Sequence, residues 1–277
     1  MSAPGTDTAI YEPAGADGIA VVTLDHFPVN SLSRAVMNRC AEAIIAIEND
    51  PSCKGVVVQG AGRCFCAGAD ISQFGTETEA PVKIPRDVTD MLGFEGLSVP
   101  AVAAIHGYAL GGGLEAALGC HYRVIDANSS VGLPEVNIGL LPGGQGTQRL
   151  PRLIGCEAAL ALMTSGEHAS AAQAVDWGVC DEIVPAGSDM LAAAKALCTS
   201  KMGAPVKRIY DMPAPQPTAD FDALQQQMAK ARPGEIAPGA IIRCVQACCA
   251  GPTFKDGDRA EKKEFGWVAR TAVLSLP

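Results

Sequence analysis

Two glycine-rich turns constrain the fold of this chain more than any other feature, because each directly follows a short apolar strand. The strand predicted at 54–59 (KGVVVQ) leads into GRCFCAGAD at 62–70, and the strand predicted at 100–105 (PAVAAI) leads into GYALGGGLE at 107–115. Nearly continuous apolar strands are typical of a sheet that is buried on both faces. Such strands, alternating with helices, indicate an α/β fold with parallel pairing.

The alternation of strands and helices continues through the first 200 residues. Apolar residues recur three or four positions apart after Ser33, which predicts a helix that ends near Asp50. Ser33 is a suitable N-cap for this helix. The polar, proline-containing stretch at 75–87 predicts a loop. The other elements predicted here are strands at 18–24, 121–126 and 181–184, and helices from Gly111, at 155–164, at 170–177 and from Ser188.

The last part of the chain has a different, mostly helical pattern. Pro213–Pro217 (PAPQP) predicts a stiff, extended linker. Helical segments are predicted beyond it at 219–231, 238–250 and 258–271. We therefore predict an α/β core at 1–200 and a helical C-terminal region at 201–277.

Composition and charge exclude several classes of protein. The chain has 277 residues, of which 48 % are hydrophobic, so it can bury a large core and is not a disordered chain. Its formal net charge of −9 disfavours a nucleic-acid partner. The most apolar stretch, 99–120, is interrupted by His106, Glu115 and several glycines, so no membrane span is predicted.

The cysteines and histidines predict neither disulfides nor a metal site. There are eleven cysteines, an odd number without any CxxC pair, which favours free thiols in a reducing compartment. The four histidines do not cluster with acids or cysteines at a metal-binding spacing. The first 18 residues lack the pattern of a signal peptide or of a mitochondrial presequence, so a cytoplasmic location is expected.

The two glycine-rich turns are also the best candidate for chemistry. A strand-to-helix turn presents unpaired backbone N–H groups and the positive end of a helix dipole, and N–H groups from two neighbouring turns can bind one oxygen as an oxyanion hole. Glu115 lies in the first turn of the predicted helix, and Glu135 lies in an apolar stretch rich in glycine and proline. Two carboxylates in different environments can divide acid and base work.

These residues also allow other interpretations. Gly111–Ala116 matches the dinucleotide-binding pattern GxGxxG/A, but Glu115 would then repel the phosphates. Glu115 can equally be a first-turn residue that only complements the helix dipole. For Cys64 and Cys66 packing is favoured over a nucleophilic role, for His106 a place in the core over catalysis, and for Asp70 a helix cap.

Taken together, these motifs resemble the enoyl-CoA hydratase/isomerase (crotonase) family. GRCFCAGADI at 62–71 is similar to the oxyanion-loop motif GxxFxAGADI of that family, and the block from Pro100 to Gly155 is similar to its main signature. The resemblance covers about residues 8–200. PVNSLS at 28–33, the segment 163–185 and the tail from Gly234 resemble a narrower group, the hydratase/isomerase half of multifunctional fatty-acid β-oxidation enzymes.

The resemblance implies a fold and a set of site residues. The fold would be a spiral of repeated ββα units with a helical C-terminal region. The oxyanion N–H groups would belong to Ala69 and Gly112, and the catalytic carboxylates would be Glu115 and Glu135. The residues implied in substrate binding are Asn30, Ala67, Asp70 and Ile71.

The resemblance also implies an activity, the hydration of 2-enoyl-CoA thioesters in β-oxidation, with 3-enoyl-CoA to 2-enoyl-CoA isomerisation as a second activity. The alternatives are a dedicated isomerase and a non-catalytic member that binds CoA thioesters. No metal and no cofactor are expected, since CoA is part of the acyl-CoA substrate. A homotrimer or a homohexamer is expected, with a monomer as the alternative.

Overall fold

The computed structural model describes residues 8–73 and 92–274. The loop predicted at 75–87 lies outside these residues. The described residues pack into two compact units, one made of those within 1–131 and 169–208 and the other of those within 132–168 and 209–277. The boundary that we place at residue 200 stays a prediction, because packing into compact units does not say which segment folds alone.

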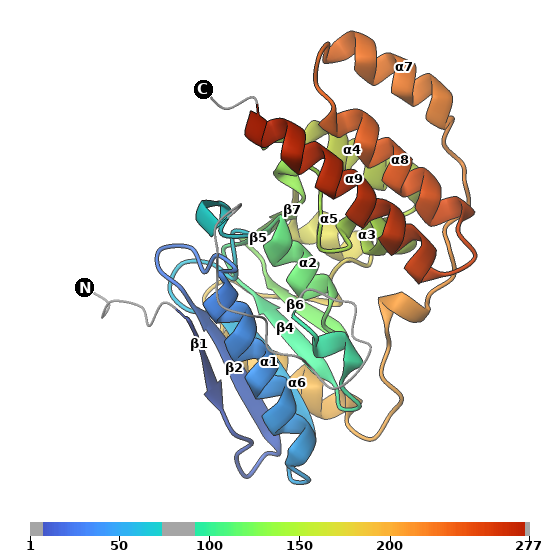
Figure 1. Ribbon diagram of the computed structural model, residues 1–277. Coiled ribbons are helices and arrows are strands. Elements are labelled where there is room, and N and C mark those ends of the chain that lie inside the picture. The colour runs from blue at the N-terminus through green and yellow to red at the C-terminus, as the bar shows by residue number, and fades with distance from the viewer. Residues whose placement is uncertain (1–7, 74–91, 275–277) are drawn as a thin grey trace. The chain divides into compact units, whose positions relative to one another are not determined.

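The first unit is built on a six-stranded sheet with the order β1-β2-β3-β4-β6-β9, of which β1, β2, β4 and β6 are labelled in Figure 1. From β2 onwards neighbouring strands pair in parallel, as the strand pattern predicts, and β1 pairs antiparallel with β2 at the edge. The strands are β1 Thr8–Glu12, β2 Ile19–Asp25, β3 Gly55–Gly60, β4 Ala101–Ile105, β6 Tyr122–Asp126 and β9 Glu182–Val184. The predicted α/β class is confirmed, whereas β1 was not predicted.

Two helices that pack on this sheet each begin at a side-chain cap. The Ser33 side chain accepts a hydrogen bond from Val36 N–H and starts α1 (Arg34–Asn49), which confirms the predicted cap. Helix α6 (Met190–Lys201) packs against β3, β4 and β6, and it starts at an Asp189 cap, one residue later than predicted from Ser188. One buried valine from each of four strands lies in the core cluster that includes α6: Val57, Val102, Val124 and Val184.

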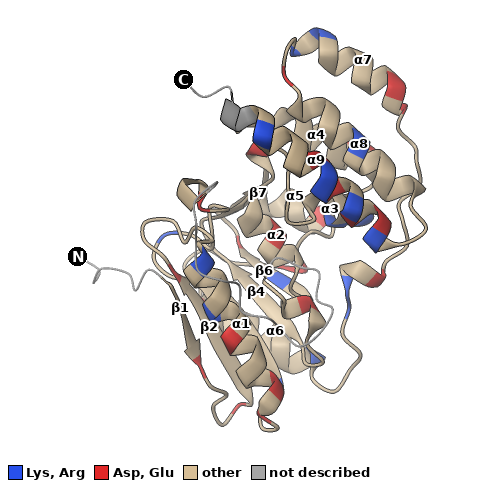
Figure 2. Cartoon of the chain, viewed as in Figure 1, with Lys and Arg blue, Asp and Glu red and all other residues tan. Residues whose placement is uncertain are grey.

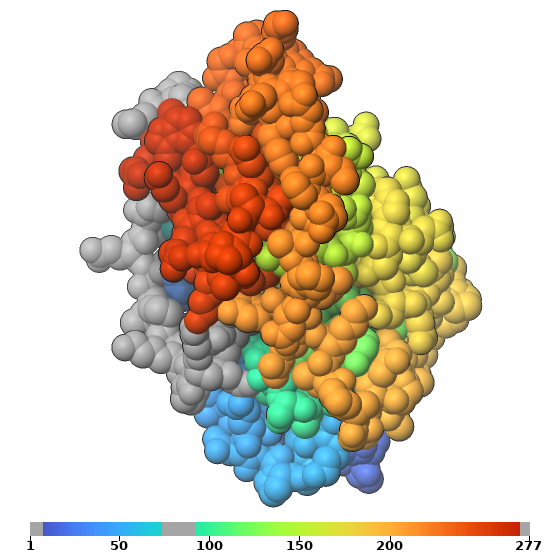
Figure 3. Space-filling view, turned by 90° about the vertical axis from the view of Figure 1, so that its right-hand side faces the viewer, coloured from blue at the N-terminus to red at the C-terminus, as the bar shows by residue number. Residues whose placement is uncertain are grey.

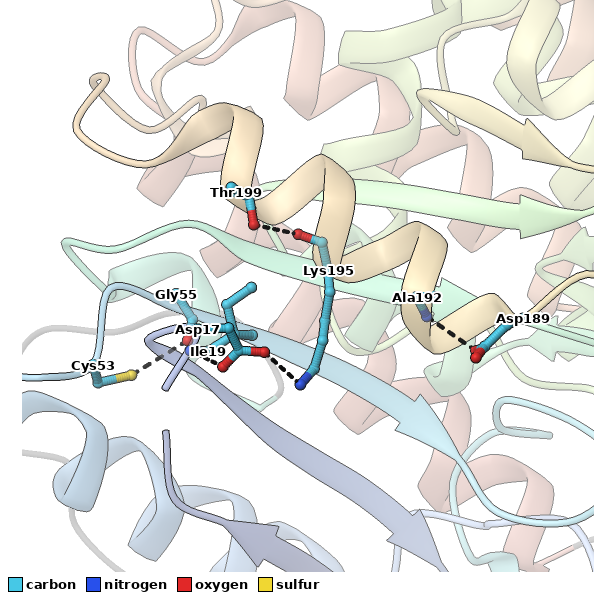
Figure 4. A network of polar contacts seen from close by, with 8 residues as sticks. All are labelled: Asp17, Ile19, Cys53, Gly55, Asp189, Ala192, Lys195 and Thr199. Carbon is cyan, nitrogen blue, oxygen red and sulfur yellow. Dashed lines mark hydrogen bonds and ion pairs between the residues drawn. The ribbon is translucent and has the colours of Figure 1, made fainter. Parts of the chain in front are cut away.

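An ion pair joins α6 to the start of the sheet. Lys195 Nζ lies 2.7 Å from Asp17 Oδ2, and the other carboxylate oxygen of Asp17 accepts from Ile19 N–H at 3.0 Å (Figure 4). Asp17 thus fixes both the first residue of β2 and a turn of α6. Because the pair is half-exposed, it contributes at most about 1 kcal/mol to stability.

A second, three-stranded sheet has the order β5-β7-β8. Its strands are β5 Tyr108–Leu110, β7 Ser130–Gly132 and β8 His168–Ser170, each too short to give a sequence signal. The short helices next to these strands are α2 (Gly112–Leu118) and α5 (Ala171–Asp176). Strand β5 leads directly into α2, so this sheet positions the helix that carries Glu115.

The second unit is helical. Its α-helices are α3 Gly146–Ile154, α4 Cys156–Ser165, α7 Phe221–Ala231, α8 Ala237–Ala250 and α9 Phe254–Leu274, and a 3-10 helix spans Pro134–Ile138. Helix α8 packs against α3, α4, α7 and α9. In the space-filling view, the orange and red atoms of the C-terminal helices adjoin one another (Figure 3). Acidic and basic residues are interspersed along α9 (Figure 2).

A carboxylate from α9 replaces a local cap at the start of α3. The N-cap residue of α3, Gln145, has a positive φ of 75° and its side chain does not cap the helix. Glu261 accepts hydrogen bonds from Gln145 N–H at 2.6 Å, from Thr147 N–H at 3.2 Å and from the Thr147 hydroxyl. Because Glu261 is fully buried, these bonds are shielded from water.

The described residues include every cysteine of the chain. All eleven cysteines are free thiols, and every one but Cys249 is buried.

Within residues 8–73 and 92–274, no helix has both the length and the apolar character needed to cross a bilayer.

Candidate functional site

The first glycine-rich turn forms an extended segment that lies between two other parts of the first unit. On one side, Cys66 N–H donates to Tyr108 O at 3.2 Å and Leu110 N–H donates to Cys66 O at 3.0 Å. On the other side, Ala67 N–H donates to Val29 O at 3.0 Å and Leu32 N–H donates to Gly68 O at 2.8 Å. The segment 64–70, which we call the oxyanion loop, is therefore held from both sides.

Two glycines permit the close approach of the oxyanion loop to the start of α2. A Cβ at Gly113 would lie 2.3 Å from the carbonyl oxygen of Cys66, so any side chain there would collide with the loop backbone. Gly68 has a φ of +115°, and a Cβ there would lie 3.5 Å from the backbone nitrogen of Gly112. The backbones at Gly68 and Gly112 are therefore near neighbours.

The geometry on either side of Ala69 fixes the direction of its N–H group. Leu32 N–H donates to the oxygen of Gly68, and Asp70 N–H donates to the oxygen of Leu32 at 3.3 Å. In a parallel bridge of this kind, the N–H and C=O of the middle residue point to the opposite side. The N–H of Ala69 therefore points away from Leu32, and Ala69 as a whole is exposed.

Gly112 is the second expected donor, and this assignment stays a prediction. It is the first residue of α2, where backbone N–H groups have no acceptor within their own helix and the dipole is positive. Since Gly68 and Gly112 are neighbours, the N–H groups of Ala69 and Gly112 belong to adjoining turns. Two such donors are what an oxyanion hole requires.

Glu115 lies on the same helix as Gly112. It is the fourth residue of α2, so it belongs to the first turn, and only 1 % of its surface is exposed. Its N–H donates to Gly111 O at 3.0 Å, as in a regular helix. A carboxylate buried at a helix N-terminus is stabilised by the dipole.

Glu135 belongs to the second unit. It lies in the 3-10 helix Pro134–Ile138, is half-buried, and its backbone oxygen accepts from Leu140 N–H at 3.0 Å. The side chain of Asn137 donates to Gly166 O at 3.3 Å, which ties this short helix to the end of α4. Pro134 and these bonds give Glu135 a defined backbone. Its assignment as a catalytic carboxylate stays a prediction.

The expected substrate-binding residues are brought together in the first unit. Ala67 is half-buried in the oxyanion loop, and Ile71 is 61 % exposed just after it. The Asp70 carboxylate accepts from the N–H and hydroxyl of Ser72, so it does act as a local cap. Asn30 is different, because its side chain is buried and bonded to backbone. Their contacts with a substrate stay predictions.

The remaining candidates have structural roles. Burial raises the pKa of the Cys66 thiol to about 12 and also raises the pKa of Cys64, which fits packing rather than a thiolate nucleophile. His106 is half-buried, not fully in the core, and its Nε2 bonds to Gly62 O at 3.1 Å. Among the described residues, no group of three or more His, Cys, Asp or Glu could hold a metal ion.

Comparison with known proteins assigns this chain to a family. The family model described as "Enoyl-CoA hydratase/isomerase" matches residues 14–231. The chain belongs to the enoyl-CoA hydratase/isomerase family. The predicted family resemblance and the predicted crotonase-type fold are thereby confirmed, and the match includes the oxyanion loop, Gly112, Glu115 and Glu135 within its range.

Curated and solved relatives agree with this family. The chain is 39 % identical to the "Peroxisomal bifunctional enzyme" of Cavia porcellus over 258 residues, which is 89 % of this chain and 34 % of that protein. It is 39 % identical to a "Probable enoyl-CoA hydratase" of Bacillus subtilis (strain 168), over 65 % of this chain and 70 % of that protein. The chain thus spans about a third of the bifunctional enzymes that it matches.

The fold is shared with a solved hydratase structure. The crystal structure of carnitinyl-CoA hydratase from Mycobacterium avium superposes with a TM-score of 0.67 at 26 % identity, covering 97 % of this chain and 95 % of that one. The α/β sheet core and the helical C-terminal region are therefore part of a fold that this chain shares with that structure.

Proposed function

We propose that this chain is an enoyl-CoA hydratase, which adds water across the 2,3 double bond of 2-enoyl-CoA thioesters in fatty-acid β-oxidation. The observation that carries the proposal is the pair of adjoining turns that bear Ala69 N–H and Gly112 N–H, with buried Glu115 in the same helical turn as Gly112. Family membership and the names of the relatives support it.

The proposed mechanism assigns one task to each group. The thioester oxygen accepts hydrogen bonds from Ala69 N–H and Gly112 N–H. Glu115 takes a proton from the water while the oxygen of that water bonds to C3. The electron pair of the double bond moves toward the thioester, so negative charge develops on the oxygen in the hole. Glu135, in its protonated form, then delivers a proton to C2. One water is consumed and no redox partner is needed.

The binding energy of CoA would position the acyl group. The residues proposed to line the CoA path are Asn30 through its backbone, and Ala67, Asp70 and Ile71. Because CoA is part of the substrate, the proposed reaction needs no metal or organic cofactor.

A second activity, the isomerisation of 3-enoyl-CoA to 2-enoyl-CoA, is proposed at the same site. The family to which the chain belongs is described as one of hydratases and isomerases. Isomerisation needs one group that removes a proton from C2 and returns it to C4, and Glu135 is the group assigned to C2. A dedicated isomerase would not need Glu115.

Assembly and location are part of the same proposal. We favour a homotrimer or homohexamer, as in the family that the sequence resembles, over a monomer. A cytoplasmic location is supported by the eleven free cysteines, which suit a reducing compartment.

The test is the hydration of crotonyl-CoA, followed by the loss of its enone absorbance, in wild type, Glu115→Gln and Glu135→Gln. Each single variant should lose about 10³-fold or more, and the double variant should be little worse, because residues that act as a unit are not additive. The matched control is Glu157→Gln, an exposed first-turn glutamate of α4, which should keep full activity.

The alternatives give different results. A dedicated isomerase would convert 3-enoyl-CoA and leave crotonyl-CoA unchanged, and a non-catalytic binder would bind both and change neither. If either single variant kept more than about a tenth of wild-type activity, its residue would be wrongly assigned.

A further inference from the structure

Asn30 has an unusual backbone and a buried side chain. It lies between β2 and α1, and its φ of +55° is one of two positive values at non-glycine residues in the described chain. Asn tolerates this conformation better than most residues. Its side chain is only 3 % exposed, which is rare for an amide group unless all of its polar atoms are bonded.

The Nδ2 end of the Asn30 amide faces backbone carbonyls more than 30 residues away in the sequence. Its Nδ2 donates to the oxygens of Ala61 and Cys64, each at 2.8 Å, and to the oxygen of Phe65 at 3.3 Å. Its Oδ1 accepts from His26 N–H at 3.2 Å. Because three carbonyl oxygens face Nδ2, this atom must be the donor end of the amide.

These carbonyls belong to the turn that leads into the oxyanion loop. Phe65 uses its N–H on one side, donating to His106 O at 2.9 Å, and its C=O on the other side, accepting from Asn30. Two residues later, Ala67 N–H donates to Val29 O, the neighbour of Asn30. Asn30 therefore fixes the start of the segment whose later residue, Ala69, presents the proposed oxyanion donor.

We propose that Asn30 is a positioning residue, whose side-chain amide holds the oxyanion loop so that Ala69 N–H is aimed at the thioester oxygen. The inference deepens the hydratase function proposed above and rests on it. It replaces a direct substrate contact of the Asn30 side chain, because that amide is already occupied by backbone.

The test compares Asn30→Gly with Asn30→Ala. Both variants lose the amide, but glycine adopts a φ of +55° readily and alanine does not, so the alanine variant should unfold at a lower temperature. If Asn30 acts through the oxyanion loop, both should lower kcat by the same factor, about 10-fold to 10²-fold, with KM changed less than about threefold. This loss is smaller than that from deleting the donor itself.

A second readout reports the hole directly. A 2,4-dienoyl-CoA absorbs at longer wavelength when its carbonyl oxygen accepts hydrogen bonds, because polarisation extends the conjugation. We expect a smaller red shift for this bound probe in both Asn30 variants than in wild type. Val36→Ala, which removes buried atoms from α1, is the control that lowers stability while keeping kcat and the red shift.

The outcomes separate the two proposals. A folded Asn30→Gly with wild-type kcat and red shift overturns the positioning role, and so does a loss of kcat that follows stability across all three variants. Should Asn30→Gly fail to fold, Asn30→Asp is measured instead. Its side chain keeps the acceptor for His26 N–H but offers at most one hydrogen to the carbonyls, where Asn30 offers two. A full red shift in Asn30→Asp also overturns the positioning role.

The proposed function has its own independent result. If wild type shifts the dienoyl-CoA spectrum but does not hydrate crotonyl-CoA, the hydratase function fails while Asn30 is still judged by the red shift. If wild type produces neither, there is no working oxyanion hole and both proposals fail.

Discussion

Replacing Glu261 should destabilise the second unit strongly, although Glu261 lies far along the sequence from the helix that it caps. In Glu261→Ala, the N–H groups of Gln145 and Thr147 lose their acceptor at the start of α3. Both are buried backbone donors that cannot turn toward water. The Thr147 hydroxyl is less constrained, since it can rotate.

The magnitude follows from these two donors. A buried donor left without a partner costs about 1–3 kcal/mol, so the two N–H groups together predict a loss of about 2–6 kcal/mol in the free energy of unfolding. For a chain of this size, a loss of about 3 kcal/mol corresponds to a fall in Tm of roughly 6–12 °C. Folded proteins usually have a total of about 5–15 kcal/mol, so this loss is a large fraction of it.

The assay is urea unfolding followed by circular dichroism, with the loss taken from the shift in midpoint at constant slope. Glu264→Ala is the matched control, three residues further along α9. Glu264 pairs with Arg243 at 2.6 Å in a partly exposed position, and removing it should cost about 1 kcal/mol or less. A Glu261→Ala variant that loses no more than Glu264→Ala would refute the capping argument.

Three further predictions concern the site. Gly112→Val should place a branched side chain at the proposed hole and lower kcat about 10²–10³-fold in a folded protein, measured on crotonyl-CoA; normal activity would contradict the hole. Glu115→Gln should abolish hydration but keep a measurable part of any isomerase rate on 3-enoyl-CoA, whereas Glu135→Gln should remove both; the reverse pattern would exchange the two roles. Cys66, with a pKa of about 12, should resist iodoacetamide at pH 8 in the native protein and react after unfolding, as mass spectrometry would show, because the thiolate needed for attack is populated only near the raised pKa.

The sequence predicts well where local signals are strong. Ser33 and the apolar spacing after it predicted α1 closely, and the continuous valines of 54–59 predicted β3. Helix α3 was not predicted, because it starts in a glycine-rich run, contains Pro151 and takes its cap from Glu261, more than 100 residues away. Strand β1 was missed because its signal is weak and, among the described strands, it pairs with β2 alone.

The candidate site shows the same division. Glycines at 68 and 111–113 mark the two turns, and the resemblance to the family motifs implies which N–H groups are the expected donors. The side-chain role of Asn30 could not be predicted, because its hydrogen-bond partners are carbonyls 31, 34 and 35 residues away that carry no side-chain signal. In the sequence, Asn30 lies two residues after Pro28 and shortly before a predicted helix. This pattern indicates only a tight bend.

The oxyanion loop, held between residues 29–32 and residues 106–110, has a consequence for the newly synthesised chain. One flank is made more than 30 residues before the loop and the other about 40 residues after it. While the ribosome is still adding residues up to Gly112, the loop has only one of its two flanks, and Ala69 has no second donor beside it. The growing polypeptide should therefore be unable to bind a thioester in the proposed hole until the start of α2 has left the exit tunnel. The loop is thus synthesised well before it can first bind substrate.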